Sequence, residues 1–99
     1  MMHISSEDFV AKIKANEAMN IIDVREQFEV EQGMIKGAIH IPMNDIPEQM
    51  ENLDREKEYY IVCAHAVRSA NVTHYLLAND YKAVNVEGGM AVIEPMLGE

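Results

Sequence analysis

The sequence predicts an α/β fold: a central parallel sheet of four or five strands with helices on both faces. Short apolar, β-favouring runs alternate along the chain with segments whose apolar residues have helical spacing. The connections between successive runs are too long for hairpins, so consecutive strands are expected to be parallel and joined by helical crossovers. With 99 residues, the chain is expected to form a single domain over 1–99 with one hydrophobic core.

Each element rests on a local signal. Ser5 and the acidic residues after it are typical of a helix N-cap, and the apolar run Met19–Val24 is typical of a strand buried on both faces. In chain order the predicted elements are a helix over Ser6–Lys14, a strand over Met19–Val24, one or two helical turns around Phe28 and Val30, a short strand at Ile39–Ile41, a helix from Asn44 or Asp45 through Leu53, a strand over Tyr59–Val62, a helix that follows the Cys63–Arg68 loop and runs to about Asn79, a strand over Ala83–Val86, and an apolar terminal segment from Met90 to Leu97.

Composition argues against several classes of function. Seventeen acidic and eight basic residues give a net charge of −9, which repels nucleic acid and anionic membranes, and we expect neither as a partner. No apolar run is long enough to cross a bilayer and no secretion signal is visible, so we expect a cytoplasmic protein. One cysteine permits no internal disulfide, and the four histidines lack paired ligand spacing, so we expect no metal site and no cofactor.

The one cysteine stands at a place with distinctive chemistry. Cys63 directly follows the strand-like run Tyr59–Val62, and a six-residue loop from Cys63 to Arg68 leads into the next helical segment. At such a junction, backbone N–H groups without intrachain partners and the helix dipole favour an anion. The same environment favours the thiolate, which is the reactive form of cysteine. Cys63 is therefore a candidate nucleophile, and Arg68 a candidate anion-binding or loop-supporting group.

Other interpretations are open for these residues. A lone cysteine after an apolar strand is often a core residue, but the arginine, the following serine and the strand–loop–helix context favour chemistry here. Asp23 and Arg25 end another predicted strand at the edge that faces the ligand crevice in α/β sheets, where an ion pair is their expected role. His40 alternates with two isoleucines in a short strand, and we expect a structural or solvent-facing histidine.

Four motifs together resemble the successive signatures of a single-domain rhodanese. The residues that carry the resemblance are Ile21–Glu26, Gly33–Pro42, Cys63–Ser69 and Val86–Met90, which span nearly the whole chain. The resemblance implies the rhodanese-like fold and a sulfurtransferase activity. In such enzymes the loop cysteine takes a sulfane sulfur from a donor such as thiosulfate or a persulfide, becomes a persulfide, and passes the outer sulfur to cyanide or a thiol.

Carried onto this chain, the resemblance makes Cys63 the nucleophile. The expected anion cradle is formed by the loop residues Ala64, His65, Ala66, Val67, Arg68 and Ser69, with Arg68 holding the shape and positive potential of the loop. The expected partners are a small sulfur donor and a thiol or cyanide acceptor, with a sulfur-carrier protein as a further candidate. With no second cysteine, the persulfide must be discharged to an outside acceptor.

Loop length and composition refine the expectation. Only four residues separate Cys63 from Arg68, whereas phosphatases with a cysteine–arginine loop have five, so phosphoester hydrolysis and arsenate reduction are disfavoured. Many rhodaneses have glycine where this chain has Ala66, and basic residues where it has Ala64 and Val67, so we expect weak turnover with thiosulfate.

The alternative function is a non-catalytic or regulatory binding module. A thiol–disulfide oxidoreductase lacks the second cysteine it needs.

Overall fold

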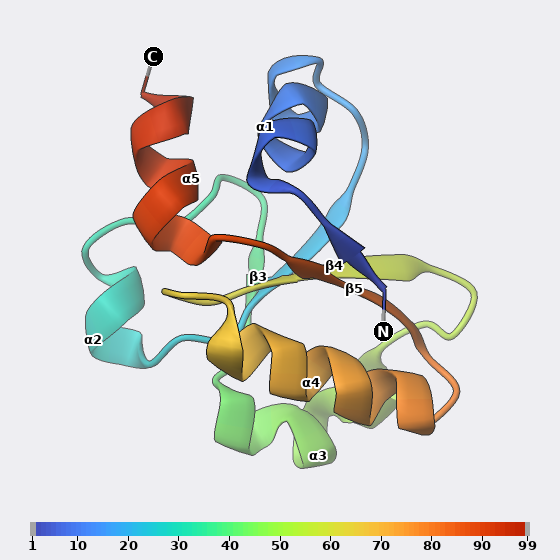
Figure 1. Cartoon of the computed structure of the whole chain (residues 1–99). Coiled ribbons are helices and arrows are strands. Elements are labelled where there is room, and N and C mark those ends of the chain that lie inside the picture. Colours follow the sequence, from blue (N-terminus) through green and yellow to red (C-terminus); the bar gives the residue numbers. More distant parts are fainter. Residues whose placement is uncertain (1, 99) are drawn as a thin grey trace.

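The computed structural model describes residues 2–98 (Figure 1). Its elements, in chain order, are β1 (His3–Ile4), α1 (Ser6–Lys14), β2 (Asn20–Asp23), α2 (Gln27–Val30), β3 (Ile39–His40), a 3-10 turn (Met43–Asp45), α3 (Ile46–Gln49), a second 3-10 turn (Met50–Asn52), β4 (Glu58–Val62), α4 (Val67–Ala78), β5 (Lys82–Val86) and α5 (Gly89–Leu97). None of the helices in this described part is long and apolar enough to span a membrane.

The five strands form one parallel sheet in the order β1-β5-β4-β2-β3. Ile61 of β4 lies at the centre, opposite Ile22 of β2 on one side and Asn85 of β5 on the other. The predicted α/β class with a central parallel sheet is therefore confirmed. Because all strands run in the same direction, the carboxyl ends of β2, β4 and β5 meet at one edge, which is where parallel α/β sheets place their ligands.

Helices cover both faces of the sheet (Figure 1). Successive strand residues point to opposite faces, so Ile21 packs with α1 and α5 while Ile22 packs with α3 and α4. One core cluster contains Phe9 of α1 and Ile93 of α5, both fully buried. The other cluster contains Ile46 and Leu76, from α3 and α4. This double burial explains why the strands read as continuous apolar runs instead of alternating ones.

Local signals placed several elements well. Helix α1 occupies the predicted Ser6–Lys14, and the Ser5 hydroxyl caps it by accepting a hydrogen bond from the Asp8 amide at 3.1 Å. The helical turn predicted around Phe28 is α2. Strand β1 was not predicted, because two residues carry no measurable periodicity. It forms through its pairing with β5, in which His3 lies opposite Asn85.

Candidate active site

Cys63 lies immediately after β4, at the carboxyl edge of the sheet, and the loop that follows it is shorter than predicted. Helix α4 begins at Val67, so Arg68 and Ser69 belong to its first turn and not to the loop. The boundary was misplaced because no Ser, Thr, Asp or Asn marks the N-cap. The N-cap is Ala66, in the left-handed conformation with φ 68° and ψ 4°. Glycine adopts this conformation most easily, and alanine does so at some cost in strain.

The thiol of Cys63 is in contact with the first turn of α4. The backbone N–H of Ser69 donates to Sγ at 3.2 Å, and the Ser69 hydroxyl oxygen lies 3.2 Å from the same atom. Both residues are buried, with Cys63 1% and Ser69 0% exposed. A thiolate at this position would accept from the amide and from the hydroxyl, at the positive end of the α4 dipole. The predicted proximity of the cysteine to a helix N-terminus is thus present in the structure.

The remaining amides of the loop are available to a ligand. Among residues 2–98, the backbone N–H groups of Ala64 to Arg68 donate no hydrogen bond to another protein group. Their carbonyls are differently placed: the Met90 amide donates to the Cys63 oxygen at 2.7 Å, and the Ala91 amide donates to the Ala64 oxygen at 3.0 Å. The start of α5 therefore ties down the carbonyl side of the loop, while the amide side keeps its donors free for an anion.

Gly89 makes this close approach of α5 to the loop feasible. A Cβ atom at this position would lie 2.4 Å from the carbonyl oxygen of Ala64, and the backbone has φ +65°. Any side chain here would force the loop and the helix apart. The motif Val86–Met90 thus includes a glycine whose lack of a side chain positions the Cys63 loop.

Arg68 forms an ion pair with Glu29 of α2, a residue that the sequence analysis did not single out. Its two terminal guanidinium nitrogens donate to the two carboxylate oxygens of Glu29 at 2.6 and 2.8 Å. Chiefly through these hydrogen bonds, Arg68 lowers the pKa of Glu29 to about 2, against the opposing effect of burial. The same contact raises the pKa of Arg68. The positive charge expected at the loop is therefore largely neutralised.

Asp23 and Arg25 form the second ion pair at this edge, as expected. Arg25 contacts both carboxylate oxygens of Asp23, with a shortest distance of 2.8 Å, and also donates to the carbonyl oxygen of Gly33 at 2.8 Å. His40 Nε2 lies 2.7 Å from the Arg25 carbonyl oxygen, which can only accept, so this nitrogen carries the proton. These contacts join β2, β3 and the segment between them, which is a structural role.

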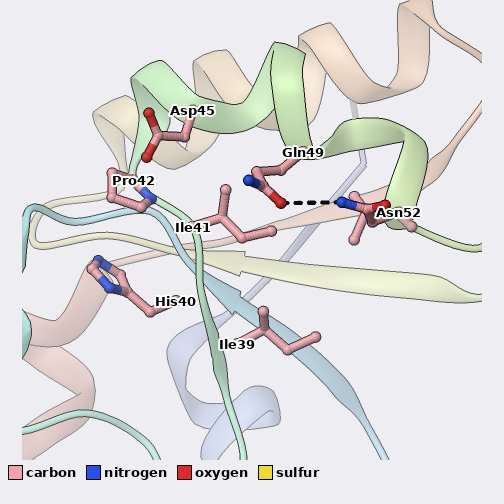
Figure 2. Close-up of a pocket in the computed structure, with 8 residues that line it drawn as sticks. Ile39, His40, Ile41, Pro42, Asp45, Gln49 and Asn52 are labelled. Atoms are coloured by element: carbon pink, nitrogen blue, oxygen red, sulfur yellow. Dashed lines mark hydrogen bonds between the residues drawn. The ribbon is translucent and has the colours of Figure 1, made fainter.

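The pocket in Figure 2 lies away from the cysteine. Its volume is about 330 Å³, and it is bounded by the edge strand β3 and the segment that follows, where Asn52 donates to Gln49 at 3.1 Å. Its lining residues are Ile39, His40, Ile41, Pro42, Asp45, Gln49, Asn52 and Leu53. None of them belongs to Cys63–Ser69, so this pocket does not accommodate the candidate chemistry. Within residues 2–98, no group of three or more acidic, histidine or cysteine side chains could hold a metal ion.

Comparison with known proteins places the fold and this loop in a family. The model of the rhodanese-like domain matches residues 5–94. The chain belongs to the rhodanese-like family. The resemblance inferred from the four motifs is thereby confirmed, and the rhodanese-like loop, with its cysteine at the end of the central strand, is the candidate active site.

Individual relatives agree with this assignment. The chain is 52% identical over 91 residues to "Putative sulfurtransferase YtwF" of Bacillus subtilis, covering 92% of this chain and 88% of that protein. It is 36% identical over 88 residues to "Putative sulfur carrier protein YrkF" of the same organism, covering 88% of this chain and 48% of that protein. Among solved structures, SSP1007 from Staphylococcus saprophyticus superposes with a TM-score of 0.90 at 42% identity, covering 94% of this chain and 93% of the other.

Proposed function

We propose that the protein is a sulfurtransferase in which Cys63 takes a sulfane sulfur from thiosulfate or a persulfide and passes it to a thiol or cyanide. The observation that carries the proposal is the contact of Cys63 Sγ with the amide and hydroxyl of Ser69, at the N-terminus of α4. The family match and the relatives named sulfurtransferases support it. No cofactor is needed, because the reaction is an exchange of sulfur–sulfur bonds.

The first half-reaction is a displacement at sulfur. The Cys63 thiolate attacks the outer sulfur of thiosulfate and a new sulfur–sulfur bond forms. The bond between the outer and central sulfur atoms breaks, and sulfite leaves with its electron pair. The cysteine becomes a persulfide anion, so the charge is conserved. The amides of Ala64 to Arg68, which donate to no other described residue, would stabilise the negative charge of the persulfide together with the Ser69 amide.

The second half-reaction discharges the persulfide. A thiolate or cyanide attacks the outer sulfur, and the Cys63 thiolate is the leaving group. Since Cys63 is the only cysteine of the chain, the acceptor must come from outside. A protein acceptor is part of the proposal because a relative is named a sulfur carrier protein. The reaction requires a reduced thiol, which places it in the cytoplasm in this proposal.

Loop composition supports slow turnover with thiosulfate. Ala64 and Val67 supply no cation, and the one arginine of the loop region is paired with Glu29. A dianionic donor therefore meets backbone dipoles but little net positive charge, on a protein of net charge −9.

The test is the intact mass of the reduced protein after incubation with thiosulfate and, separately, with glutathione persulfide. We expect the wild-type protein to gain the mass of one sulfur atom, to lose it on addition of cyanide, and to be labelled less completely by thiosulfate. The control is Cys63→Ser, which should gain nothing. Complete absence of an adduct on folded wild-type protein would contradict the proposal.

One observation favours a second function, that of a non-catalytic binding module. Cys63 is only 1% exposed, so a donor reaches Sγ only if the loop yields locally. A binding module would keep its partner interaction in Cys63→Ser, and it would fail to form a persulfide with every donor. The mass experiment therefore separates the two functions.

A further inference from the structure

Both residues of the Glu29–Arg68 ion pair are held in place by the helices to which they belong. Glu29 belongs to a capping box at the start of α2, in which its Oε1 accepts a hydrogen bond from the Glu26 amide at 2.9 Å. Arg68 occupies the second position of α4, with its side chain 30% exposed against 20% for Glu29. The carboxylate thus receives three donors, one from its own helix and two from the guanidinium. Such a bidentate pair has a fixed geometry that holds the arginine against α2.

The pair lies next to the proposed nucleophile. Arg68 directly precedes Ser69, whose amide and hydroxyl contact the Cys63 thiol. The interaction of Arg68 with the charge of Cys63 also contributes to the raised pKa of the arginine. Arg68 is the only arginine or lysine between Cys63 and Asn79, and Arg25, at the same edge of the sheet, is bonded to Asp23. The net charge of the Glu29–Arg68 pair is therefore a main contribution to the potential near the thiol, to which the charge of Glu26 adds.

We propose that Glu29 determines donor specificity: by neutralising Arg68 it makes the site discriminate against dianionic sulfur donors in favour of donors with less charge. This inference rests on the proposed sulfurtransferase function and assigns a specificity role to a residue outside the loop. Glu29 is a positioning residue, since it acts through Arg68. Its removal would leave the Arg68 cation without its bonded carboxylate, with Glu26 as the remaining acidic neighbour that acts on it, and we expect roughly a fivefold to tenfold change in relative rate for one unit of donor charge.

Two donors isolate the effect of charge. Thiosulfate carries two negative charges and releases sulfite, whereas methanethiosulfonate carries one and releases methanesulfinate. In both reactions the Cys63 thiolate forms a bond to the outer sulfur, and the bond from that sulfur to the oxidised sulfur breaks. The leaving group departs with the electron pair, so atoms and charge balance. The measured quantity is the ratio of kcat/KM for thiosulfate to that for methanethiosulfonate.

Two single variants change the charge of the pair, and a double variant and a control outside the pair complete the set. Glu29→Gln keeps an acceptor for the Glu26 amide and leaves the pair at +1, and we expect the ratio to rise fivefold to tenfold. Arg68→Gln leaves the pair at −1, and the ratio should fall by a similar factor. The double variant restores zero charge and should return the ratio to within about twofold of the wild type. Glu31→Gln, which removes an exposed carboxylate just beyond α2, is the matched control and should leave the ratio unchanged.

A second readout does not depend on sulfur transfer. Iodoacetate and iodoacetamide alkylate a thiolate by the same reaction but differ by one charge, so the ratio of their rates at Cys63 reports the local potential. We expect the iodoacetate to iodoacetamide ratio to rise in Glu29→Gln, to fall in Arg68→Gln and to recover in the double variant. The ratio in Glu29→Gln should also decrease more steeply with added salt.

The outcomes separate this inference from the proposed function. If alkylation follows the charge of the pair but no donor loads the wild-type protein, the electrostatic role of Glu29 stands and the sulfurtransferase function falls. If sulfur is transferred but both ratios are unchanged, or move in the same direction in the two single variants, Glu29 has only a structural role and the inference is overturned. The opposite signs expected for the single variants distinguish charge from loss of folding.

Discussion

Two carboxylate–arginine pairs lie at the same edge of the sheet and differ in what surrounds them. Asp23 and Arg25 are 0% and 6% exposed in their side chains, whereas Glu29 and Arg68 are 20% and 30% exposed. Arg25 also donates to the Gly33 carbonyl, so the buried pair fastens the chain between β2 and β3. The partly exposed pair connects α2 to the start of α4, beside the thiol.

The comparison shows that burial determines what an ion pair can do. A fully buried charge depends on its partner, so the Asp23–Arg25 pair is fixed and serves the fold. A pair in contact with water can lose one charge and remain folded, so it is free to adjust the potential at a neighbouring site. The same two chemical groups therefore have a structural role in the Asp23–Arg25 pair and, in our proposal, a specificity role in the Glu29–Arg68 pair.

The largest expected effect is on the buried pair. Arg25→Met removes the guanidinium and leaves the Asp23 carboxylate buried without its main partner, so we expect a loss of about 3–5 kcal/mol in the free energy of unfolding. Urea denaturation followed by circular dichroism measures it. The double variant Asp23→Asn with Arg25→Met should recover part of the loss, because no uncompensated charge remains. If Arg25→Met lost only as much unfolding free energy as is expected for a surface pair, burial would not distinguish the two ion pairs.

A smaller effect is expected from pH, through Glu29. The folded-state pKa of about 2 lies below the value of 4.5 for the unpaired carboxyl, so the ionised group stabilises the folded state. This stabilisation is fully present above pH 4.5 and is lost as the pH falls towards 2. We expect it to amount to about 2 kcal/mol, allowing for screening by solvent.

The measurement is the free energy of unfolding as a function of pH in the wild type and in Glu29→Gln. The difference between the two proteins should be constant above pH 5 and shrink below pH 4.5. A difference independent of pH throughout this window would show that the carboxylate is not held by Arg68 in solution.

The smallest effects on the free energy of unfolding are expected from arginine-to-lysine substitutions, which change the geometry of each pair but not its charge. Arg68→Lys and Arg25→Lys both keep the positive charge but lose the bidentate contact. We expect Arg68→Lys to cost about 0.5–1 kcal/mol in unfolding free energy, because its pair is partly hydrated. Arg25→Lys should cost at least twice as much, since lysine leaves buried acceptors unpaired. Equal costs in paired urea denaturation experiments would mean that burial does not distinguish the two sites.

Local sequence signals were sufficient for most of the fold. Apolar runs predicted the positions of strands β2 to β5, and Ser5 marked the start of α1 at the observed residue. The start of α4 was misplaced, because it depends on Ala66 adopting a left-handed backbone that its side chain does not favour. Strand β1 was missed because two residues become a strand only by pairing with β5.

The candidate site was predictable where its parts are close in sequence. Cys63 and Ser69 are six residues apart, and a strand–loop–helix connection brings them together with little help from the rest of the chain. Glu29 is 39 residues from Arg68, and their contact depends on how α2 packs against the start of α4. No periodicity or motif in one sequence reports such a contact. The role of Gly89 was likewise visible only once α5 was seen against the loop.

The burial of Cys63 also bears on how the protein withstands oxidants. A disulfide between two copies would require their sulfur atoms to approach to about 2 Å, which two thiols buried under folded loops cannot do. Oxidation beyond the sulfenic acid is irreversible for most cysteines and is fastest at exposed thiolates. In the persulfide that we propose, the outer sulfur would be oxidised before Sγ, and a thiol could then remove it. Burial of the Cys63 sulfur, in our proposal, therefore also protects it from the irreversible reactions to which an exposed thiolate is prone.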